Sequence, residues 1–212
     1  MSRKHRDRSW PPADAVAPLA GPVTDNHTHL PVGGPSGAAP DDAAVPAPKG
    51  DAPGAAPTGA APDAAELVRR AAAVGVTRVI TSACETAAWE GSLELARDLA
   101  GVRVAAAIHP NEAVAHAGVR EVGPDGLEPL SEAHHAEPLD EAMSRLEGLV
   151  RAHRGLVVAV GETGLDYFRA GERGRAVQRE AFRAHIALAK ELGLALQIHD
   201  RDAHEDCVAV LE

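Results

Sequence analysis

The chain has 212 residues, of which 45% are hydrophobic and 25% are charged, an ordinary composition for a globular protein. A formal net charge of -10 excludes binding of nucleic acid through a broad basic surface, so any phosphate contact has to be local or metal-mediated. Two distant cysteines, Cys84 and Cys207, do not form a disulfide framework, and no apolar run approaches the length of a membrane span. Residues 1–8 are basic but are not followed by the apolar segment of a secretory signal peptide, so we expect a cytoplasmic protein without a membrane partner.

The first 62 residues contain one regular segment between two irregular stretches. Residues 1–20 are charged and then rich in Pro and Ala, which predicts a flexible N-terminal arm. Residues 23–30 form an extended segment in which Asp25, His27 and His29 share one face. Residues 31–62 repeat Pro, Gly, Ala and Asp without periodicity, which predicts a disordered insertion of low complexity. We therefore assign the domain to residues 21–212.

From Asp63 onward, predicted helices and strands alternate. Asp63 is placed to cap a helix that ends at Gly75. Further strands are predicted at 76–81, 102–109, 156–161 and 194–199. Further helices are predicted at 87–100, 138–153 and 175–192, with another beginning at 202, and a loop rich in Gly, Glu and His at about 111–137. Alternation with short links predicts right-handed βαβ units and a parallel sheet.

With the segment at 23–30, these strands supply five strand–helix units. A complete (β/α) barrel has eight units and usually about 250 residues, more than this chain provides outside its irregular stretches. We therefore expect an α/β fold, a TIM-like (β/α) barrel with about five of its eight units present. An open doubly wound sheet is the alternative.

A carboxylate follows the most apolar of these strands. The run Val-Val-Ala-Val-Gly-Glu-Thr-Gly-Leu-Asp-Tyr-Phe at 157–168 begins as a strand buried on both faces and then reaches Glu162. An acidic side chain at this position is costly to bury unless it is paired or bound to a metal. Taken alone, Glu162 is better explained as a loop carboxylate that caps the next helix or pairs with an arginine than as a metal ligand.

Histidines occur at the ends of other predicted strands. His27 and His29 end the first strand, His109 the third and His199 the fifth, while Cys84 lies just past the second. In a barrel the carboxyl ends of the strands meet at one mouth, where these side chains would converge with Glu162. His-x-His on a strand aims both imidazoles the same way, which suits Zn²⁺ or a similar cation. The joint placement predicts a metal site, although His109 or His199 alone would be interpreted as structural.

These residues also resemble the ordered motifs of the TatD family of metal-dependent hydrolases. The matching runs are Asp-Asn-His-Thr-His-Leu at 25–30, Ala-Ile-His-Pro at 107–110, Val-Gly-Glu-Thr-Gly-Leu-Asp-Tyr at 160–167, Gln178 with Phe182, and Ile-His-Asp-Arg-Asp-Ala at 198–203. The resemblance implies a barrel of the metal-dependent hydrolase type with one or two divalent ions, Mg²⁺, Mn²⁺ or Zn²⁺. It further implies deoxyribonuclease or phosphodiesterase activity, with DNA ends or another phosphodiester as substrate.

The resemblance assigns roles to four residues. His27 and His29 match ligands of one metal, Glu162 matches the bridging, catalytic carboxylate, and His199 matches a ligand of the second metal. A histidine after the sixth strand and an aspartate after the eighth would lie beyond Glu212, so we expect a fragment of a hydrolase. The alternatives are an inactive metal-binding fragment, or an amidohydrolase or lactonase of the wider His-x-His barrel group. The last is less favoured because no lysine lies near a strand end to bridge two metals.

Other polar residues near these motifs have two interpretations each. His109 is a candidate catalytic residue that contacts the scissile phosphate or the leaving group. Asp166 either orients a ligating histidine or provides a charge at a helix start. Arg201 either binds a phosphate or pairs with a neighbouring acid, and Tyr167 is a candidate for stacking on a terminal base. The remaining histidines of the domain are expected to be solvated: His116, His134, His135, His153, His185 and His204. The oligomeric state stays open, a monomer being the expectation.

Overall fold

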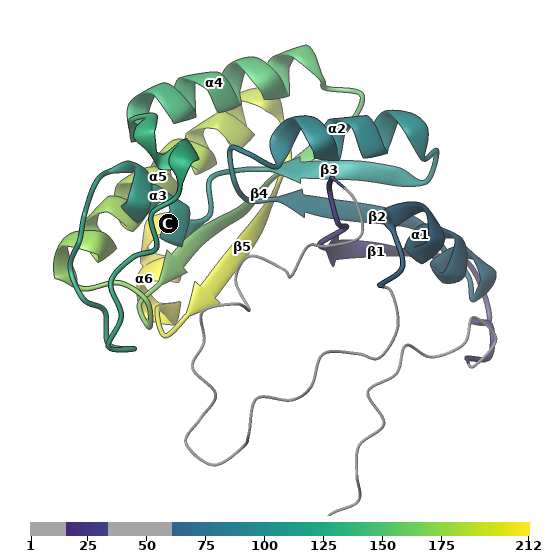
Figure 1. Ribbon diagram of the computed structural model, residues 1–212, viewed down its shortest axis with the longest axis horizontal. Helices are drawn as coiled ribbons and strands as arrows, with labels where there is room; N and C mark the ends of the chain where they lie inside the picture. Colours follow the sequence, from purple (N-terminus) through teal and green to yellow (C-terminus); the bar gives the residue numbers. More distant parts are fainter. Residues whose placement is uncertain (1–15, 34–60) are drawn as a thin grey trace, which may run out of the picture.

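The computed structural model describes residues 16–33 and 61–212 (Figure 1). The expected N-terminal arm up to residue 15, and residues 34–60 of the expected insertion, lie outside the described residues. The elements in chain order are β1 (Val23–Thr28), α1 (Ala64–Ala73), β2 (Val76–Ala83), α2 (Trp89–Asp98), β3 (Val102–Ala106), α3 (Pro110–His116), the 3-10 helix η1 (Ala133–Ala136), α4 (Leu139–Ala152), β4 (Val157–Asp166), α5 (Glu172–Leu192), β5 (Ala195–Arg201) and α6 (His204–Leu211). The expected alternation of strands and helices is confirmed.

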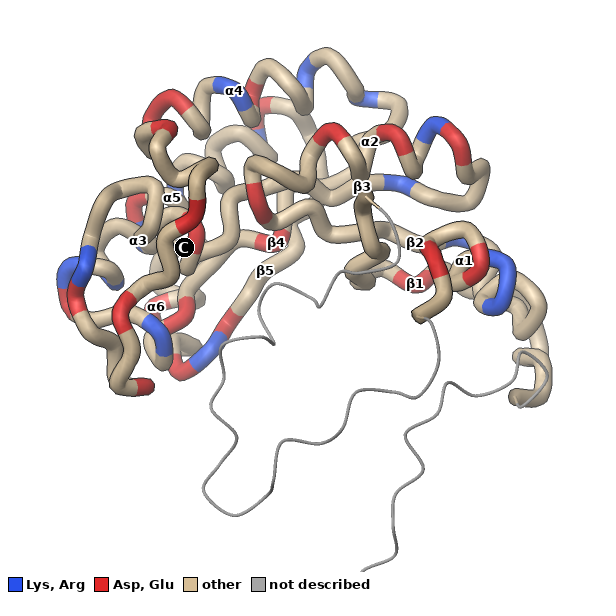
Figure 2. Tube along the Cα trace, in the orientation of Figure 1, with Lys and Arg blue, Asp and Glu red and all other residues tan. Residues whose placement is uncertain are grey.

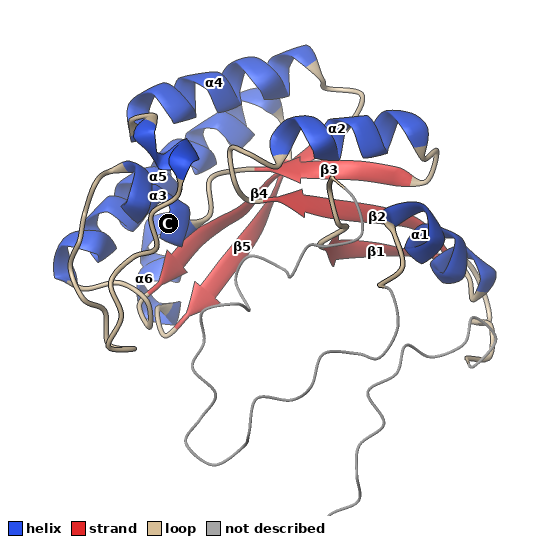
Figure 3. Cartoon of the chain, viewed as in Figure 1, coloured by secondary structure: helices blue, strands red, loops and turns tan. Residues whose placement is uncertain are grey.

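The five strands form one parallel sheet in the order β1-β2-β3-β4-β5, so each strand pairs with the next strand along the chain (Figure 3). Helices α2, α4 and α5 lie along one face of this sheet (Figure 1). On the other face, side chains from non-adjacent strands meet. The side-chain amide of Gln197 on β5 donates to the Asn26 carbonyl on β1, and its oxygen accepts a hydrogen bond from Ser82 on β2 at 2.9 Å. The sheet is therefore curved into half of a barrel, and the fold is α/β and TIM-like.

The core lies between the sheet and these helices because each helix carries an apolar stripe at helical spacing. Helix α2 buries Leu93 and Ala96, and α4 buries Leu146 and Val150. The indole N–H of Trp89 donates to the Ala107 carbonyl at 3.1 Å, which satisfies its one polar atom inside the core. Burial of a side chain such as Leu146 contributes about 1.5–3 kcal/mol, so this layer holds the helices on the sheet.

Helix ends follow the sequence in most places. The Asp63 carboxylate accepts a hydrogen bond from the Glu66 N–H at 2.8 Å, which confirms the expected cap of α1. Gly193 adopts the left-handed conformation after α5, with φ of 64°, and stops that helix.

The structure corrects the expectation of a loop at about 111–137. This connection contains α3 and η1, and the strand expected to reach His109 ends at Ala106. Helix α3 forms because Pro110 suits a first helical turn and the His109 ring accepts a hydrogen bond from the Asn111 N–H. A helix of 7 residues is too short to show a clear apolar period in the sequence.

Candidate metal centre at the carboxyl ends of the strands

The strands bring the predicted site residues to one edge of the sheet. His27 lies near the end of β1 and His29 just beyond it, while His109 follows β3 as the cap of α3. Glu162 lies within β4. This strand was expected to end at Gly161, but it continues to Asp166. Strand β5 pairs with β4 so that His199 lies opposite Gly164, which places its ring beside Glu162.

One group of side chains consists of His27, His29 and Glu162. Nε2 of His27 lies 3.3 Å from Oε2 of Glu162, and Nε2 of His29 lies 3.9 Å from the same oxygen. The two imidazole Nε2 atoms are 3.3 Å apart. The histidine side chains are about 40% exposed, so this group opens to solvent while the carboxylate, 12% exposed, forms its floor.

A second group consists of His109, Glu162 and His199, and it is more buried. Nδ1 of His199 lies 3.0 Å from Oε1 of Glu162, and Nε2 of His109 lies 3.2 Å from Nδ1 of His199. Glu162 therefore belongs to both groups, and its two oxygens face different histidines. A carboxylate in this arrangement can bridge two cations, one through each oxygen.

The charges of this cluster are strongly coupled. Burial alone would raise the pKa of Glu162, but the hydrogen bond from His199 and the charges of His109 and His27 outweigh it and lower that pKa to about 2. Burial alone would lower the pKa of His199, but hydrogen bonds to Asp166 and Glu162 raise it to about 9. Near neutral pH the edge thus holds an ionised Glu162 paired with a protonated His199, and a cation that binds there has to displace the His199 proton.

Asp166 contacts the ring nitrogen of His199 that does not face Glu162. Its Oδ2 lies 3.3 Å from Nε2 of His199 and accepts a hydrogen bond from the Asn111 amide at 3.2 Å. The backbone N–H of Asp166 donates to Gln178 at 2.9 Å, and the Gln178 amide donates to the Asp166 carbonyl at 3.2 Å. Sequence reasoning missed Asn111 because its partner is 55 positions away and no spacing rule connects them.

The donors of both groups fit divalent cations. Within each group, one ligand atom per residue lies within 4.8 Å of the others. Imidazole nitrogens suit Zn²⁺ and similar ions, and the shared carboxylate also suits Mn²⁺ or Mg²⁺. The site residues present therefore fit one or two cations.

Two predicted substrate contacts lie in packed surroundings. Tyr167 is 9% exposed, and its hydroxyl contacts Asp206 and accepts a hydrogen bond from Arg179 at 2.8 Å. The Arg201 guanidinium at the end of β5 lies 4.1 Å from the centre of the Phe168 ring, a cation–π contact. Cys84 lies beside the centre, with its sulfur 3.9 Å from Oε2 of Glu162.

Four of the histidines expected to be solvated are not, which is a correction. His185 is completely buried and His116 is 5% exposed, while the side chains of His134 and His135 are 15% and 3% exposed. Burial lowers the pKa of His116, against the opposing hydrogen bond to the Glu137 carbonyl. His116, His134 and His135 are shielded because α3 and η1 pack where a loop was expected. His185 is buried for another reason: it lies on α5, with its ring against the Ile108 N–H and the Thr163 hydroxyl.

A family model described as TatD related DNase matches residues 24–212. A metal-dependent hydrolase TatD from Mycobacterium tuberculosis, described as uncharacterized, is 41% identical over 152 residues, which cover 68% of this chain and 47% of that protein. A protein from Cronobacter sakazakii named 3'-5' ssDNA/RNA exonuclease TatD is 31% identical over 150 residues, covering 71% of this chain and 48% of that protein.

Solved structures give the same picture for the fold. The crystal structure of the TatD homologue YJJV from Escherichia coli matches with a TM-score of 0.52 and 26% identity, over 68% of this chain and 47% of that chain. A TatD family hydrolase from Entamoeba histolytica matches with a TM-score of 0.50 and 19% identity, over 68% of this chain and 43% of that chain. This chain thus spans about half the length of the relatives it matches. Within residues 16–33 and 61–212, no helix has both the length and the apolar character to cross a membrane.

Proposed function

This chain belongs to the family of TatD-related DNases, and we propose from that premise that it supplies the metal-binding half of a hydrolase that cleaves phosphodiester bonds. The proposed substrate is the end of a nucleic-acid strand. The name of the similar Cronobacter sakazakii protein, a 3'-5' ssDNA/RNA exonuclease, supports this substrate class.

The observation that carries the proposal is the position of Glu162 between two histidine groups. Its Oε2 faces His27 and His29, and its Oε1 faces His199. Divalent cations held by these residues would supply Lewis acidity for the activation of water and for the stabilisation of charge at phosphorus. We propose Mn²⁺, Mg²⁺ or Zn²⁺ for this role.

The surrounding residues have separate tasks in this proposal. His27 and His29 hold the exposed side of the centre, and His199 holds the buried side. Asp166 fixes the His199 ring through its contact with Nε2, and Glu162 keeps the negative charge that a cation pair needs. His109 is 2% exposed and accepts the Asn111 N–H at Nδ1, so the neutral ring carries its proton on Nε2. We propose that this N–H, now 3.2 Å from His199, contacts the scissile phosphate or the leaving group.

Arg201 is the proposed phosphate contact, because it lies at the carboxyl end of β5 and its guanidinium can bond two phosphate oxygens. Lysines and arginines are otherwise dispersed over many elements (Figure 2). A substrate would therefore be held by the metal centre and a few local contacts. The proposal does not need a continuous basic groove for the substrate, which agrees with the net charge of -10.

The test is the release of nucleotides from a 3'-ended single-stranded DNA with Mn²⁺ or Mg²⁺. We expect release that Glu162→Ala lowers at least about 100-fold, because both cation groups lose their shared ligand. Glu147→Ala, on the exposed side of α4, is the control and should leave the rate unchanged. If Mn²⁺ binds at Glu162 but no nucleotide is released, the activity is refuted and a metal-binding chain remains. Turnover of esters or amides without DNA cleavage would favour the amidohydrolase alternative.

A further inference from the structure

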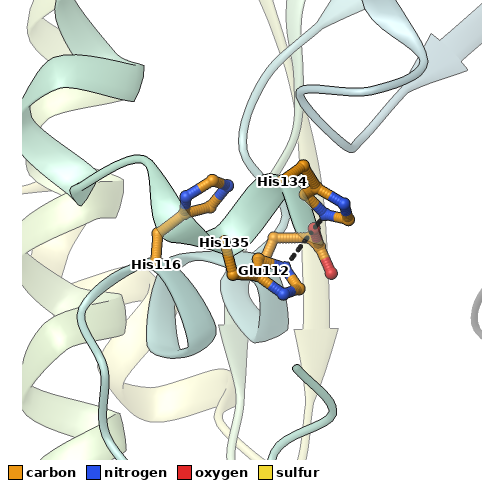
Figure 4. A group of neighbouring side chains, drawn as sticks. All are labelled: Glu112, His116, His134 and His135. Carbon is orange, nitrogen blue, oxygen red and sulfur yellow. Dashed lines mark hydrogen bonds and ion pairs between the residues drawn. The ribbon is translucent and has the colours of Figure 1, made fainter. Parts of the chain in front are cut away.

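Four side chains that belong to neither group at Glu162 gather between α3 and η1 (Figure 4). Glu112 and His116 are four residues apart on α3, a spacing that puts both on one side of the helix. His134 and His135 come from η1. One ligand atom from each of the four residues lies within 4.8 Å of the others.

The Glu112 carboxylate is at the centre of this cluster. Its Oε2 lies 2.8 Å from Nε2 of His134 and 2.9 Å from Nε2 of His135. The centres of those two rings are 4.0 Å apart, so the imidazoles converge on one oxygen. His134, His135 and Glu112 therefore place two imidazole nitrogens and one carboxylate oxygen close together.

His116 adds a buried nitrogen without a partner. Its Nδ1 lies 2.7 Å from the Glu137 carbonyl, and since a carbonyl only accepts, Nδ1 carries the ring proton. The lone pair is then on Nε2, which is buried and has no hydrogen-bond partner among the described residues. An unsatisfied buried acceptor is unfavourable, and a ligand at this position would satisfy it. A backbone carbonyl that fixes the other ring nitrogen is also the usual support of a metal-bound histidine.

His135 has a different role, because its Nδ1 is already occupied. The Glu132 N–H donates to Nδ1 of His135 at 2.8 Å, so the neutral ring carries its proton on Nε2. That N–H then donates to Glu112 and holds the carboxylate in place. His134 has no such restriction: its Nε2 donates to Glu112 at 2.8 Å, but no backbone N–H occupies its Nδ1, which faces the Glu132 carboxylate at 3.7 Å. The ring proton can therefore move to Nδ1 when a cation takes its place at Nε2.

We propose that Glu112, His116 and His134 bind one Zn²⁺ or a similar transition-metal ion, with His135 as the residue that positions Glu112. Imidazole and carboxylate ligands suit Zn²⁺, whereas Mg²⁺ and Ca²⁺ prefer oxygen ligands throughout. Ligand atoms around a tetrahedral zinc are about 3.4 Å apart, given bonds of about 2.0–2.1 Å, so the present donors need only small rotations. The ion would join η1 to α3. This site is separate from the centre at Glu162 and does not depend on the proposed function.

The test uses the full chain with Glu162→Gln and His199→Gln, which removes ligands from both groups of the first centre. Zinc binding is measured by competition with a chromophoric chelator, and zinc content by elemental analysis after gel filtration. We expect this chain to retain about one zinc. Adding His134→Gln or Glu112→Gln should weaken its zinc affinity at least about 10-fold. Adding His135→Gln should have a smaller effect, because the glutamine amide can still donate to Glu112.

The matched control is His153→Gln, which removes a histidine outside all three groups and should leave zinc affinity unchanged. Long-range ¹H–¹⁵N spectra of the histidine rings need no substitution in the cluster. Their result therefore does not depend on whether a variant folds. The spectra should show His116 protonated on Nδ1 and its Nε2 resonance shifted by one equivalent of Zn²⁺. The proposal is overturned if the Glu162→Gln/His199→Gln chain binds no zinc, if affinity is equal with and without His134, or if the His116 resonances do not respond.

Discussion

At the scale of single residues, Glu162 is held by imidazoles and by no arginine in the contacts that the described residues make. An arginine would neutralise the carboxylate permanently, because its guanidinium does not lose its proton near neutral pH. A histidine can give up its proton and offer a lone pair instead. The cluster is therefore able to exchange a proton for a cation, which an arginine–glutamate pair cannot do.

His185 shows the opposite use of a histidine, as a neutral structural group. The Ile108 N–H donates to its Nε2 at 3.1 Å, and its Nδ1 lies 2.7 Å from the Ala181 carbonyl. If His185 were protonated, the proton on its Nε2 would face the Ile108 N–H inside a fully buried site. Burial therefore lowers the pKa of His185 to about 4, against a small opposing effect of the Ala181 carbonyl.

This pKa predicts a loss of stability in acid. Between about pH 6.5 and 4 the unfolded chain takes up a proton at His185 that the folded chain excludes, so the free energy of unfolding falls as pH falls through that range. The contribution is about 3 kcal/mol from this single group. Urea unfolding at several pH values measures it, with His185→Gln expected to flatten the pH dependence although it is less stable at pH 7.

The control for this prediction is His204→Gln, at an exposed histidine, which should keep the slope of the parent chain. Equal slopes for His185→Gln and the parent chain would contradict the assignment.

The predictability of the site differed from residue to residue. His27, His29, Glu162 and His199 were placed together from strand ends alone, because the carboxyl ends of parallel strands share one edge. The division of Glu162 between two histidine groups was not derivable from spacing, since it depends on which oxygen faces which ring. The cluster at Glu112 was missed because its histidines lie in a segment that looks like a loop in the sequence.

At the scale of elements, β4 and β5 approach each other closely where they carry the site. Gly164 has φ of 139°, a conformation that side chains rarely adopt, and a Cβ at this position would overlap the His199 carbonyl. The glycine is therefore required for the pairing that sets His199 beside Glu162 and Asp166.

Gly164→Ala should lower the free energy of unfolding by at least about 2 kcal/mol, because both strain and overlap oppose the alanine. It should also weaken cation binding, since His199 has to move with β5. Thermal unfolding and a Mn²⁺ titration measure the two effects.

Gly148→Ala is the matched control, in α4, where an added Cβ meets no atom within 4 Å. It should raise stability by up to about 1 kcal/mol through the higher helix propensity of alanine. Similar effects of the two substitutions would mean that the close approach at Gly164 is not what matters.

Most element types and helix ends could be predicted, whereas the ends of β3 and β4 could not. Periodicity located the long helices α4 and α5, and Asp63 and Gly193 marked two helix ends through local chemistry. Strand β4 continues past its apolar run to Asp166, because Thr163 to Asp166 pair with β5, and pairing between distant segments leaves no local pattern. Helix α3 was missed for its shortness.

At the scale of the whole molecule, the curvature of the sheet creates the site. Gln197 bonds to β1 and β2 from β5, across the inner face, so the carboxyl ends of first and last strands are drawn toward one another. Without that curvature His27 and His199, on opposite edges of the five-stranded sheet, could not both reach Glu162. The five units and the TIM-like fold were predicted from the sequence. The observed strand order β1-β2-β3-β4-β5 excludes the doubly wound alternative, in which the order reverses at a switch point.

The two oxygens of Glu162 are proposed to serve two cation sites. Crystals of the chain soaked in Mn²⁺ test this proposal through anomalous difference maps. We predict two peaks, one among His27, His29 and Glu162 and one among His109, Glu162 and His199, both absent in Glu162→Gln crystals grown and soaked in the same way. A saturating soak that leaves no peak within bonding distance of either Glu162 oxygen would contradict the account.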